Sequence, residues 1–200
     1  MIAFRQKPAH QKGHVGTFLK EFFTNPRHTG ALFPSSKALA KRMASFVPQQ
    51  ENGLVVELGP GTGPVTLALL NAGVPPERLV LVEFSEELVN CLRRKFPQLK
   101  IIHGNACDLA DLLDQHLGKE RPEIISIVSS LPLKTLPKQV VVRISAETRK
   151  VLSKNGNLIQ FTYDIRPKQP VRYEGLNRVA STIVWKNMPP ARIDLLKWES

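Results

Sequence analysis

Short apolar runs alternate with helix-forming segments from residue 53 onward, and this alternation constrains the fold of the 200-residue chain more than any other feature. The first four runs occupy residues 54–59, 79–84, 100–104 and 123–130. Central strands of a parallel sheet are buried on both faces, so they read as continuous apolar stretches. Helices are expected between and after them, over residues 64–72, 86–95, 107–116 and 137–152. The pattern predicts an α/β fold with a mostly parallel sheet and helices on both faces.

Three further strands complete the predicted sheet at seven strands. They are expected over residues 156–163, 178–186 and 191–198, and Asn155-Gly156 is the expected turn before the first of them. A chain of this length fits one globular core and leaves little room for a separate substrate domain. We therefore expect a catalytic domain over residues 51–200, preceded by a helical, basic segment over residues 1–50.

A glycine-rich loop directly follows the first predicted strand and precedes a predicted helix. Its sequence is Glu57-Leu58-Gly59-Pro60-Gly61-Thr62-Gly63. Glycines at alternate positions let the backbone turn sharply and approach a ligand closely. The spacing is neither the GxGxxG of dinucleotide binders nor the Lys-Ser/Thr of a phosphate-binding P-loop. A nucleoside ligand without phosphates fits this loop better than a nucleotide does.

Suitable ligand-binding residues also follow the second and third predicted strands. Glu83 ends the second strand, where a carboxylate can accept hydrogen bonds from both hydroxyls of a ribose, and Phe84 can pack against an adenine. Asn105 and Ala106 follow the third strand, where their amide and backbone groups can read the edge of the base. Three strand ends with such residues at regular intervals indicate one continuous nucleoside site.

These three motifs resemble those of the Rossmann-like class I methyltransferases. The resemblance covers about residues 50–165 and implies S-adenosyl-L-methionine as the cofactor. The residues that it assigns to cofactor binding are Glu57, Gly59, Pro60, Gly61, Thr62, Gly63, Glu83, Phe84, Asn105, Ala106 and Ser129. Cys91 and Cys107 form no CxxC pair and have no histidine at metal spacing, so we expect a metal-independent reaction.

The segment after the fourth predicted strand is expected to face the reacting methyl group. It reads Ser129-Ser130-Leu131-Pro132-Leu133, and we assign Ser129, Ser130, Leu131 and Pro132 to catalysis. Methyltransferases that act on adenine often carry Asn or Asp at the position of Ser130 and an aromatic residue at that of Leu133. The amide holds the exocyclic amine and the ring stacks on the flipped base. Both groups are missing here, which argues against adenine as the acceptor.

Other residues near this segment have weaker assignments. Ser130 Oγ and the carbonyls of Leu131 and Pro132 would orient an acceptor amine, and the ring of Tyr163 would contact a methylated cation, although a structural role for this tyrosine is the competing interpretation. Basic residues that would bind a lipid phosphate, or that simply form a solvated face, are Arg143, Arg166, Lys168 and Arg172.

Together with GHVGTFLKEFF and TGALFPSS near the amino terminus, this segment resembles the bacterial phospholipid N-methyltransferases. That resemblance implies methylation of phosphatidylethanolamine and its partly methylated forms toward phosphatidylcholine. The family is itself similar to the ribosomal RNA adenine dimethylases. An RNA adenine N6-methyltransferase with the same cofactor pocket is therefore the alternative, and a nucleic-acid partner is disfavoured but stays open.

The amino-terminal segment has the character of an interfacial membrane helix. Phe18, Leu19, Phe22 and Phe23 form an apolar stripe at helical spacing, with Lys20 and Arg27 among the cations at its border. A second helix is expected after Ser35 or Ser36, with Leu39, Met43, Phe46 and Val47 facing inward, ending at Pro48. Packing of the first stripe on the protein's own sheet is the alternative. Both interpretations hold together if this segment is a substrate lid that covers the cofactor and opens at the membrane.

The net charge of +11 is unevenly distributed along the chain. Residues 1–50 and 134–200 are basic, whereas residues 51–133 carry more acids than bases. Such a field favours an anionic membrane surface or a nucleic acid, or serves solubility. No stretch reaches the roughly 18 apolar residues of a membrane span, and no signal-peptide pattern is visible. We expect a cytoplasmic protein bound peripherally to the inner face of the membrane; the oligomeric state is not predicted.

Overall fold

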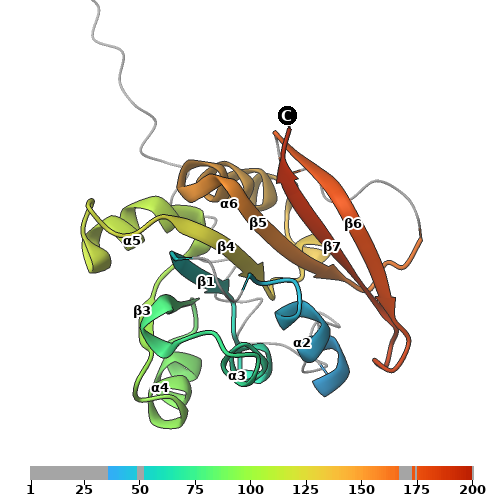
Figure 1. Cartoon of the computed structure of the whole chain (residues 1–200), viewed down its shortest axis with the longest axis horizontal. Coiled ribbons are helices and arrows are strands. Elements are labelled where there is room, and N and C mark those ends of the chain that lie inside the picture. Colours follow the sequence, from blue (N-terminus) through green and yellow to red (C-terminus); the bar gives the residue numbers. More distant parts are fainter. Residues whose placement is uncertain (1–35, 49–51, 167–172, 174, 200) are drawn as a thin grey trace, which may run out of the picture.

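The predicted α/β architecture is confirmed by a computed structural model, which describes residues 36–48, 52–166, 173 and 175–199 (Figure 1). Seven strands form one sheet in the order β3-β2-β1-β4-β5-β7-β6. Their bounds are β1 (Leu54–Leu58), β2 (Leu79–Glu83), β3 (Lys100–His103), β4 (Ile124–Ser129), β5 (Leu152–Thr162), β6 (Leu176–Val184) and β7 (Ala191–Trp198). The first five strands are parallel, and β7 runs antiparallel to both of its neighbours.

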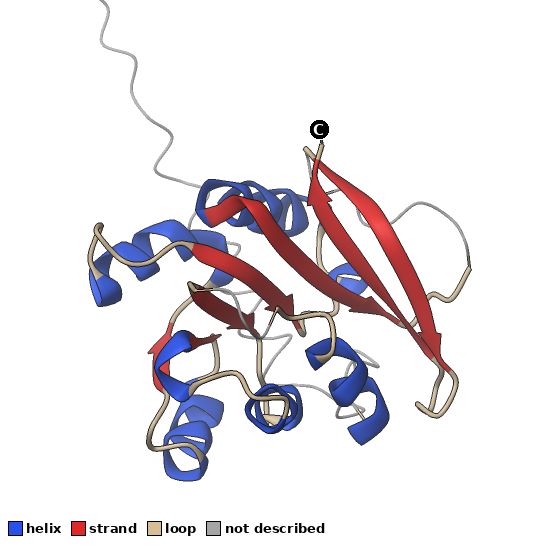
Figure 2. Cartoon of the chain, viewed as in Figure 1, coloured by secondary structure: helices blue, strands red, loops and turns tan. Residues whose placement is uncertain are grey.

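Helices cover both faces of this sheet (Figure 2). The α-helices are α2 (Lys37–Ala44), α3 (Pro64–Asn71), α4 (Glu86–Lys95), α5 (Leu109–Leu117) and α6 (Lys138–Val151). Short 3-10 turns are η1 (Pro76–Arg78), η2 (Ala106–Asp108) and η3 (Leu133–Thr135). In Figure 1, α5 and α6 lie on one face, and α2, α3 and α4 lie on the other. Each face buries its own apolar cluster, so the sheet separates two cores.

The strand order places the carboxyl ends of β1 to β5 at one edge. The order reverses between β1 and β4, because β2 pairs with one side of β1 and β4 pairs with the other. Ligands bind in open α/β sheets at such a reversal, outside the carboxyl ends of the strands. The loops that follow Leu58, Glu83, His103 and Ser129 therefore meet at one place.

Several predicted boundaries differ from the observed ones. The helix expected over 107–116 is divided into η2 and α5, because Asn105 caps η2 through its side chain. The turn expected at Asn155-Gly156 lies inside β5, which begins at Leu152 and bulges there, since Ile124 pairs with Leu152 and Ser126 pairs with Asn157. Strand β6 begins and ends two residues earlier than predicted. The element boundaries depend on tertiary pairing that periodicity does not encode.

Helix α2 belongs to the folded core. Ser36 caps it by accepting from Leu39 N at 3.2 Å, and Leu39 and Met43 are fully buried. The helix ends at Ala44, ahead of the predicted Pro48. The predicted membrane helix, with Phe18, Leu19, Lys20, Phe22, Phe23 and Arg27, lies outside the described residues. Within the described residues, no helix has the length and apolar character needed to cross a membrane.

Candidate active site

The glycine loop follows β1 in a conformation that requires glycine. Gly59, Gly61 and Gly63 have φ values of +66°, +60° and +82°, all in the left-handed region. A Cβ on Gly59 would lie 2.5 Å from Leu131 Cδ2, and one on Gly63 would lie 2.5 Å from Phe96 Cε2. A Cβ on Gly61 would meet nothing within 4 Å. Gly59 and Gly63 therefore permit packing, while Gly61 leaves open space for a ligand.

Glu57 is a buried carboxyl group beneath this loop. Its Oε2 accepts a hydrogen bond of 2.7 Å from Thr66 Oγ1, whereas Oε1 has no partner among the described residues. Burial raises the pKa of Glu57 to about 8, and the nearby Glu83 adds to this rise. A buried carboxylate oxygen without a donor fits a cationic or hydrogen-bond-donating ligand group, such as the amino group of a bound amino-acid moiety.

Glu83 ends β2 and is held by two backbone N–H groups. Its Oε2 accepts from Gly61 N at 3.0 Å, and its Oε1 accepts from Ser85 N at 2.9 Å. Burial raises the pKa of Glu83, and the hydrogen bonds from Ser85 and Gly61 partly offset the rise. Because each carboxylate oxygen has more than one lone pair, the fixed group still offers acceptors to the hydroxyls of a ribose.

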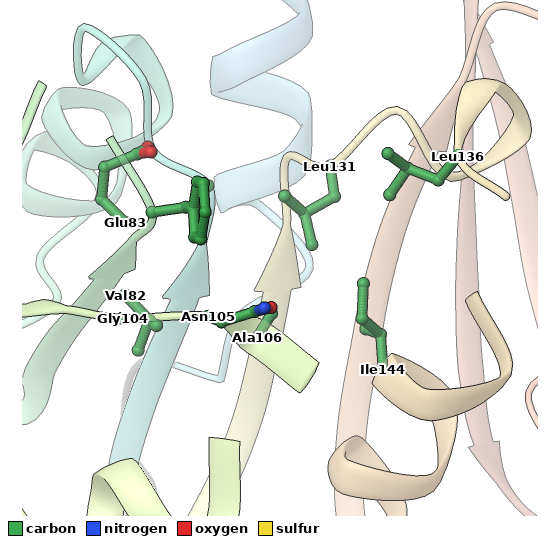
Figure 3. Close-up of a pocket in the computed structure, with 10 residues that line it drawn as sticks. Val82, Glu83, Gly104, Asn105, Ala106, Leu131, Leu136 and Ile144 are labelled. Atoms are coloured by element: carbon green, nitrogen blue, oxygen red, sulfur yellow. The ribbon is translucent and has the colours of Figure 1, made fainter. Parts of the chain in front are cut away.

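A cleft with an empty volume of about 320 Å³ opens beside Glu83. Its lining comes from the ends of β2 and β3, from the segment after β4 and from α6 (Figure 3). The lining residues are Gly59, Val82, Glu83, Phe84, Gly104, Asn105, Ala106, Leu131, Leu136 and Ile144. Figure 3 shows Leu136 and Ile144 facing the side that carries Asn105 and Ala106. The cleft is mostly apolar, as expected for a base-binding pocket.

The cleft brings together five of the residues predicted to bind the cofactor. They are Gly59, Glu83, Phe84, Asn105 and Ala106. Asn105 Oδ1 accepts from Cys107 N at 2.9 Å, which fixes the orientation of the side-chain amide. The other predicted cofactor residues, namely Glu57, Pro60, Gly61, Thr62, Gly63 and Ser129, do not line the cleft. Val82, Leu136 and Ile144 also line the cleft but were not predicted, because apolar residues of this kind occur at many core positions.

The predicted acceptor segment, residues 129–133, continues from β4 along the edge of this cleft. Ser130 N donates to Leu58 O at 2.9 Å, which ties the segment to β1. The Leu131 carbonyl accepts from Leu133 N and Gln160 Nε2, each at 2.9 Å. The Pro132 carbonyl accepts from Thr135 N at 2.9 Å and Thr135 Oγ1 at 2.8 Å. Each carbonyl already has two donors, which is the usual capacity of its lone pairs.

Ser130 differs from Leu131 and Pro132 in this respect. Its hydroxyl is buried and has no hydrogen-bond partner among the described residues, and the same holds for the buried hydroxyl of Ser129. A substrate amine would have to displace an internal donor from Leu131 or Pro132, but it would fill a vacant acceptor at Ser130 Oγ. Of the groups assigned to orienting the amine, the geometry favours the Ser130 hydroxyl.

Gln160 and Tyr173 form a buried polar pair behind the acceptor segment, and the sequence analysis identified neither. Tyr173 Oη donates to Gln160 Oε1 at 3.0 Å, and Gln160 Nε2 also donates to Phe161 O at 2.7 Å. Burial raises the pKa of Tyr173. The pair therefore reaches Leu131 through Gln160, and no sequence motif marks either position.

A second, small cavity lies on the Gln160 and Tyr173 side of the segment. It is lined by Lys134, Gln160, Thr162, Tyr173, Arg192, Asp194 and Leu196. Arg192 Nη2 pairs with Asp194 Oδ2 at 2.9 Å, and both side chains are buried. Lys134 pairs with Asp164, which Arg166 Nε also contacts at 2.8 Å. This side of the segment is therefore polar and charged, in contrast to the apolar first cleft.

Tyr163 and Arg143 line neither of the two cavities. Tyr163 packs edge to face on Phe161, with ring centroids 5.4 Å apart, in the core on the α2 side. Arg143 Nε donates to Cys107 O at 2.9 Å, and its Nη2 pairs with Asp108 at 2.6 Å. Lys168 and Arg172 lie outside the described residues. The assignments of Tyr163 and Arg143 to the acceptor stay predictions without a cavity contact.

The fold and the strand-end residues define the class. A seven-stranded sheet in which one antiparallel strand, β7, lies between β5 and β6, a glycine loop after β1 and an acid ending β2 are the features of a Rossmann-like class I methyltransferase. A family model described as a methyltransferase domain matches residues 55–156, so the chain belongs to this family. The protein is an S-adenosylmethionine-dependent methyltransferase.

Similar proteins of known name include two kinds of enzyme. The ornithine lipid N-methyltransferase of Singulisphaera acidiphila is 28% identical over 177 residues, which cover 87% of this chain and 91% of that protein. The ribosomal RNA small subunit methyltransferase A of Mycoplasma mycoides is 31% identical over 108 residues, covering 53% of this chain and 39% of that protein. The similarity to the lipid enzyme thus spans both proteins almost completely.

Among solved structures, the glycopeptide N-methyltransferase MtfA, complexed with S-adenosyl-L-methionine, has a TM-score of 0.64 at 13% identity. The match covers 84% of this chain and 96% of that one. TrmN from Thermus thermophilus also has a TM-score of 0.64, at 16% identity, covering 90% of this chain and 53% of that one. At these identities, the likeness shows a shared fold.

The residues of this chain fit S-adenosylmethionine group by group. The vacant Glu57 Oε1 would meet the amino group, Glu83 the ribose hydroxyls, and the apolar cleft the adenine. Open space over Gly61 lets the ligand approach the loop backbone. The bound cofactor supplies a methyl group on a sulfonium, which a correctly aligned nucleophile can accept directly. The task of the protein is therefore to align the acceptor and to exclude water.

Proposed function

We propose that this methyltransferase acts on the head-group amine of a membrane lipid, namely phosphatidylethanolamine and its partly methylated forms. The observation that carries the proposal is the acceptor segment itself. It borders the apolar cleft, yet Ser130 and Leu133 stand where adenine methyltransferases carry an amide and an aromatic ring. A small aliphatic amine needs no stacking platform, whereas a flipped base does.

The similarity to a lipid enzyme supports the same acceptor class. The Singulisphaera acidiphila relative is named as an ornithine lipid N-methyltransferase, and the match covers 91% of its length. Ornithine lipid and phosphatidylethanolamine both carry a primary amine close to an anionic group. We choose phosphatidylethanolamine because the acceptor segment and the amino-terminal sequence resemble those of the phospholipid N-methyltransferases.

In the proposed reaction, Ser130 Oγ orients the acceptor nitrogen. The hydroxyl is buried and vacant, so it can accept a hydrogen bond from an amine N–H. The amine must be neutral before transfer because an ammonium has no lone pair. Two acids on the Gln160 side of the acceptor segment, Asp164 and Asp194, are held in ion pairs with Lys134 and Arg192. We therefore assign the released proton to water.

The second cavity would hold the anionic part of the lipid head group. Lys134 and Arg192 line it, and Arg166 lies close by, since its backbone carbonyl accepts from Arg192 Nη1. The side chains of these residues and of Asp164 and Asp194 leave a net positive charge around the cavity. Such a site suits a phosphate next to a cationic amine.

We propose that the amino-terminal part of the chain docks on the inner face of the membrane and that the folded domain carries out catalysis. In this proposal the folded domain includes α2, because α2 packs on α3 and buries Leu39 and Met43. The stripe of Phe18, Leu19, Phe22 and Phe23, bordered by Lys20 and Arg27, would be the membrane-contacting part.

Methylation of RNA adenine is the second candidate, because the ribosomal RNA methyltransferases match about half of this chain. A direct comparison of acceptors tests both. Purified protein is incubated with labelled S-adenosylmethionine and either phosphatidylethanolamine vesicles, ornithine lipid vesicles or ribosomal RNA. We expect label in phosphatidylethanolamine. Label in ornithine lipid alone would correct the head group, and label in RNA alone would refute the lipid proposal.

A matched pair of variants controls for the cofactor site. Glu83→Ala removes the carboxylate that holds Gly61 N, and we expect it to abolish labelling of every acceptor. Glu87→Ala removes an exposed glutamate from the first turn of α4 and should leave labelling unchanged. Equal labelling by both variants would mean that the product does not arise at this site.

A further inference from the structure

The turn between β6 and β7, residues 185–190, exposes two large apolar side chains. We call it the hairpin tip. Met188 is 82% exposed and Trp185 is 67% exposed, which are the two highest values among the large hydrophobic residues that the structure describes. Leaving a tryptophan and a methionine in water forgoes the favourable free energy of burying them. Two such side chains on one turn indicate a surface with a partner.

The hairpin tip is anchored, so the exposure of these side chains is imposed by the fold. Asn187 lies between them and is 2% exposed. Its Oδ1 accepts from Ser36 N at 3.1 Å, and its Nδ2 donates to Pro189 O at 2.7 Å. Asn187 is thus held against the folded domain, while Trp185 and Met188 of the same turn are exposed.

The hairpin tip lies at the edge of the sheet that carries the active site. Arg192 at the start of β7 pairs with Thr162 at the end of β5, so the tip extends beyond the carboxyl ends of the parallel strands. Figure 1 shows the β6–β7 turn past the end of β5 and on the side of α2. A surface that contacted the tip would therefore face the acceptor segment.

The charge around the tip favours an anionic surface. Lys186 is exposed on the tip itself, and Lys37 is exposed in the first turn of α2, next to the Ser36 that contacts Asn187. Residues 183–193 contain no acid. An indole ring beside lysines suits the boundary between lipid tails and head groups, where the ring is partly apolar and the cations meet anionic lipid.

We propose that the hairpin tip inserts Trp185 and Met188 into the interface of an anionic lipid bilayer. The proposal rests on the proposed lipid acceptor and adds a membrane contact inside the folded domain. Two side chains are too few for a stable protein interface, which needs about 800 Å² on each partner. They suffice for a membrane contact when a second weak contact acts with them. The predicted amphipathic segment would supply that second contact, because it precedes Ser36 in the chain and Ser36 N donates to Asn187 of the tip.

Fluorescence tests the insertion directly because the chain has two tryptophans. Trp198 lies away from the tip, where its Nε1 donates to Ser153 O at 2.7 Å. In the full chain carrying Trp198→Phe, the emission reports Trp185 alone. Vesicles of phosphatidylethanolamine and phosphatidylglycerol should shift this emission to shorter wavelength, and brominated lipid tails should quench it. An unshifted and unquenched emission on protein that sediments with vesicles would overturn the proposal.

Sedimentation provides a second measurement in the otherwise unchanged protein. Replacing Trp185 and Met188 together by Ser should weaken vesicle binding by about a hundredfold, since each fully buried side chain contributes about tenfold. Val179→Ser, which alters a 54% exposed residue elsewhere on β6, is the matched control and should bind as the unmodified protein does. Equal losses in both variants, or no loss in either, would overturn the proposal.

These outcomes separate the membrane contact from the lipid acceptor. Labelled lipid without a Trp185 response would overturn the hairpin contact and leave the proposed function standing. A Trp185 response without labelled lipid would support the contact and refute the acceptor. A shift that requires RNA, or that grows with protein concentration in the absence of vesicles, would identify a different partner and overturn the membrane proposal.

Discussion

Gln160 donates a hydrogen bond from Nε2 to the Leu131 carbonyl at 2.9 Å, and this contact joins β5 to the acceptor segment across 29 residues of sequence. Tyr173 Oη in turn donates to Gln160 Oε1 at 3.0 Å. Because both partners are buried, the contact fixes the segment more firmly than an exposed hydrogen bond would. The glutamine thereby positions the backbone that carries Ser130.

Replacing Gln160 by Leu should therefore affect the methyl-transfer step. The variant leaves the Leu131 carbonyl with one donor, and we expect kcat to fall about tenfold or more, because small misplacements of reacting groups slow catalysis strongly. Affinity for S-adenosylmethionine, measured by calorimetry, should stay within about twofold. Gln139→Leu, which alters an exposed glutamine on α6, is the matched control. A variant with unchanged kcat would show that Gln160 serves packing alone.

Removal of the Tyr173 hydroxyl tests the same contact from its other end. Tyr173→Phe keeps the ring in the core and removes the donor to Gln160 Oε1. We expect a smaller fall in kcat than in the glutamine variant, because Gln160 Nε2 still reaches Leu131. The acceptor KM should change less than kcat if the role is positioning. Hydrogen exchange at residues 129–136 should become faster, which reports the segment without any acceptor.

The pKa of Glu57 makes stability depend on pH in a defined window. Its folded-state pKa of about 8 lies above the ordinary value of 4.5, so the folded protein binds more protons than the unfolded chain between these values. Stability contributed by this group is fully present below pH 4.5 and is lost as pH rises toward 8. The slope is about 1.4 kcal/mol for each pH unit.

Glu57→Gln should remove this slope. In urea unfolding at pH 5 and pH 8, we expect the variant to gain stability relative to the unmodified protein as pH rises. The same variant should bind S-adenosylmethionine more weakly at pH 8, since a neutral amide replaces the carboxylate. A constant stability difference across this range would show that Glu57 is ionised in the folded protein at both pH values.

The sequence predicted most of the fold and five of the residues that line the first cleft. The strands that carry Glu57, Glu83 and Ser129 are continuous apolar runs, and burial on both faces of a parallel sheet requires such runs. Glycine spacing located the loop, because the left-handed φ at Gly61 restricts the residue type. At the strands and the glycine loop, the sequence pattern follows directly from a physical requirement, namely burial or a left-handed backbone.

The contacts around the acceptor segment could not be predicted from the sequence in the same way. Gln160 lies within an apolar strand and Tyr173 lies outside any regular element, and their contact depends on how η3 and β5 approach each other. The vacancy of Ser130 Oγ likewise depends on which neighbouring donors have other partners. Tertiary hydrogen bonding of this kind leaves no periodic signal, so it appears only in the structure.

Two glycines of the same loop should respond differently to alanine. At Gly63, a Cβ would lie 2.5 Å from Phe96 Cε2, so Gly63→Ala combines a steric clash with a left-handed φ of +82°. At Gly61, a Cβ meets nothing within 4 Å, so Gly61→Ala adds mainly the left-handed penalty, about 1 kcal/mol. Thermal unfolding should show a clearly larger loss for Gly63→Ala.

Gly61→Ala should affect the binding of S-adenosylmethionine more than it affects stability. In Gly61→Ala the new methyl group occupies space that the ligand approaches, so we expect S-adenosylmethionine affinity to fall by about tenfold or more in a protein that remains folded. Calorimetry on the folded fraction measures it. Intact affinity in Gly61→Ala would place the ligand away from this turn of the loop.

Ser130→Ala tests the group that the structure leaves vacant beside the donor cleft. Ser130 Oγ is buried without a partner among the described residues, so its removal should not destabilise the protein. We expect kcat with a lipid amine to fall about tenfold, because an acceptor of one amine hydrogen bond is lost, while cofactor affinity stays unchanged. Ser126→Ala is the matched control, because Ser126 Oγ is also buried without a partner among the described residues. Ser126 lies within β4 and not in the segment that follows it, so this variant should keep full activity. If the two variants had equal kcat, the vacant hydroxyl of Ser130 would be a feature of packing, and the acceptor amine would be oriented by displacing an internal donor from Leu131 or Pro132.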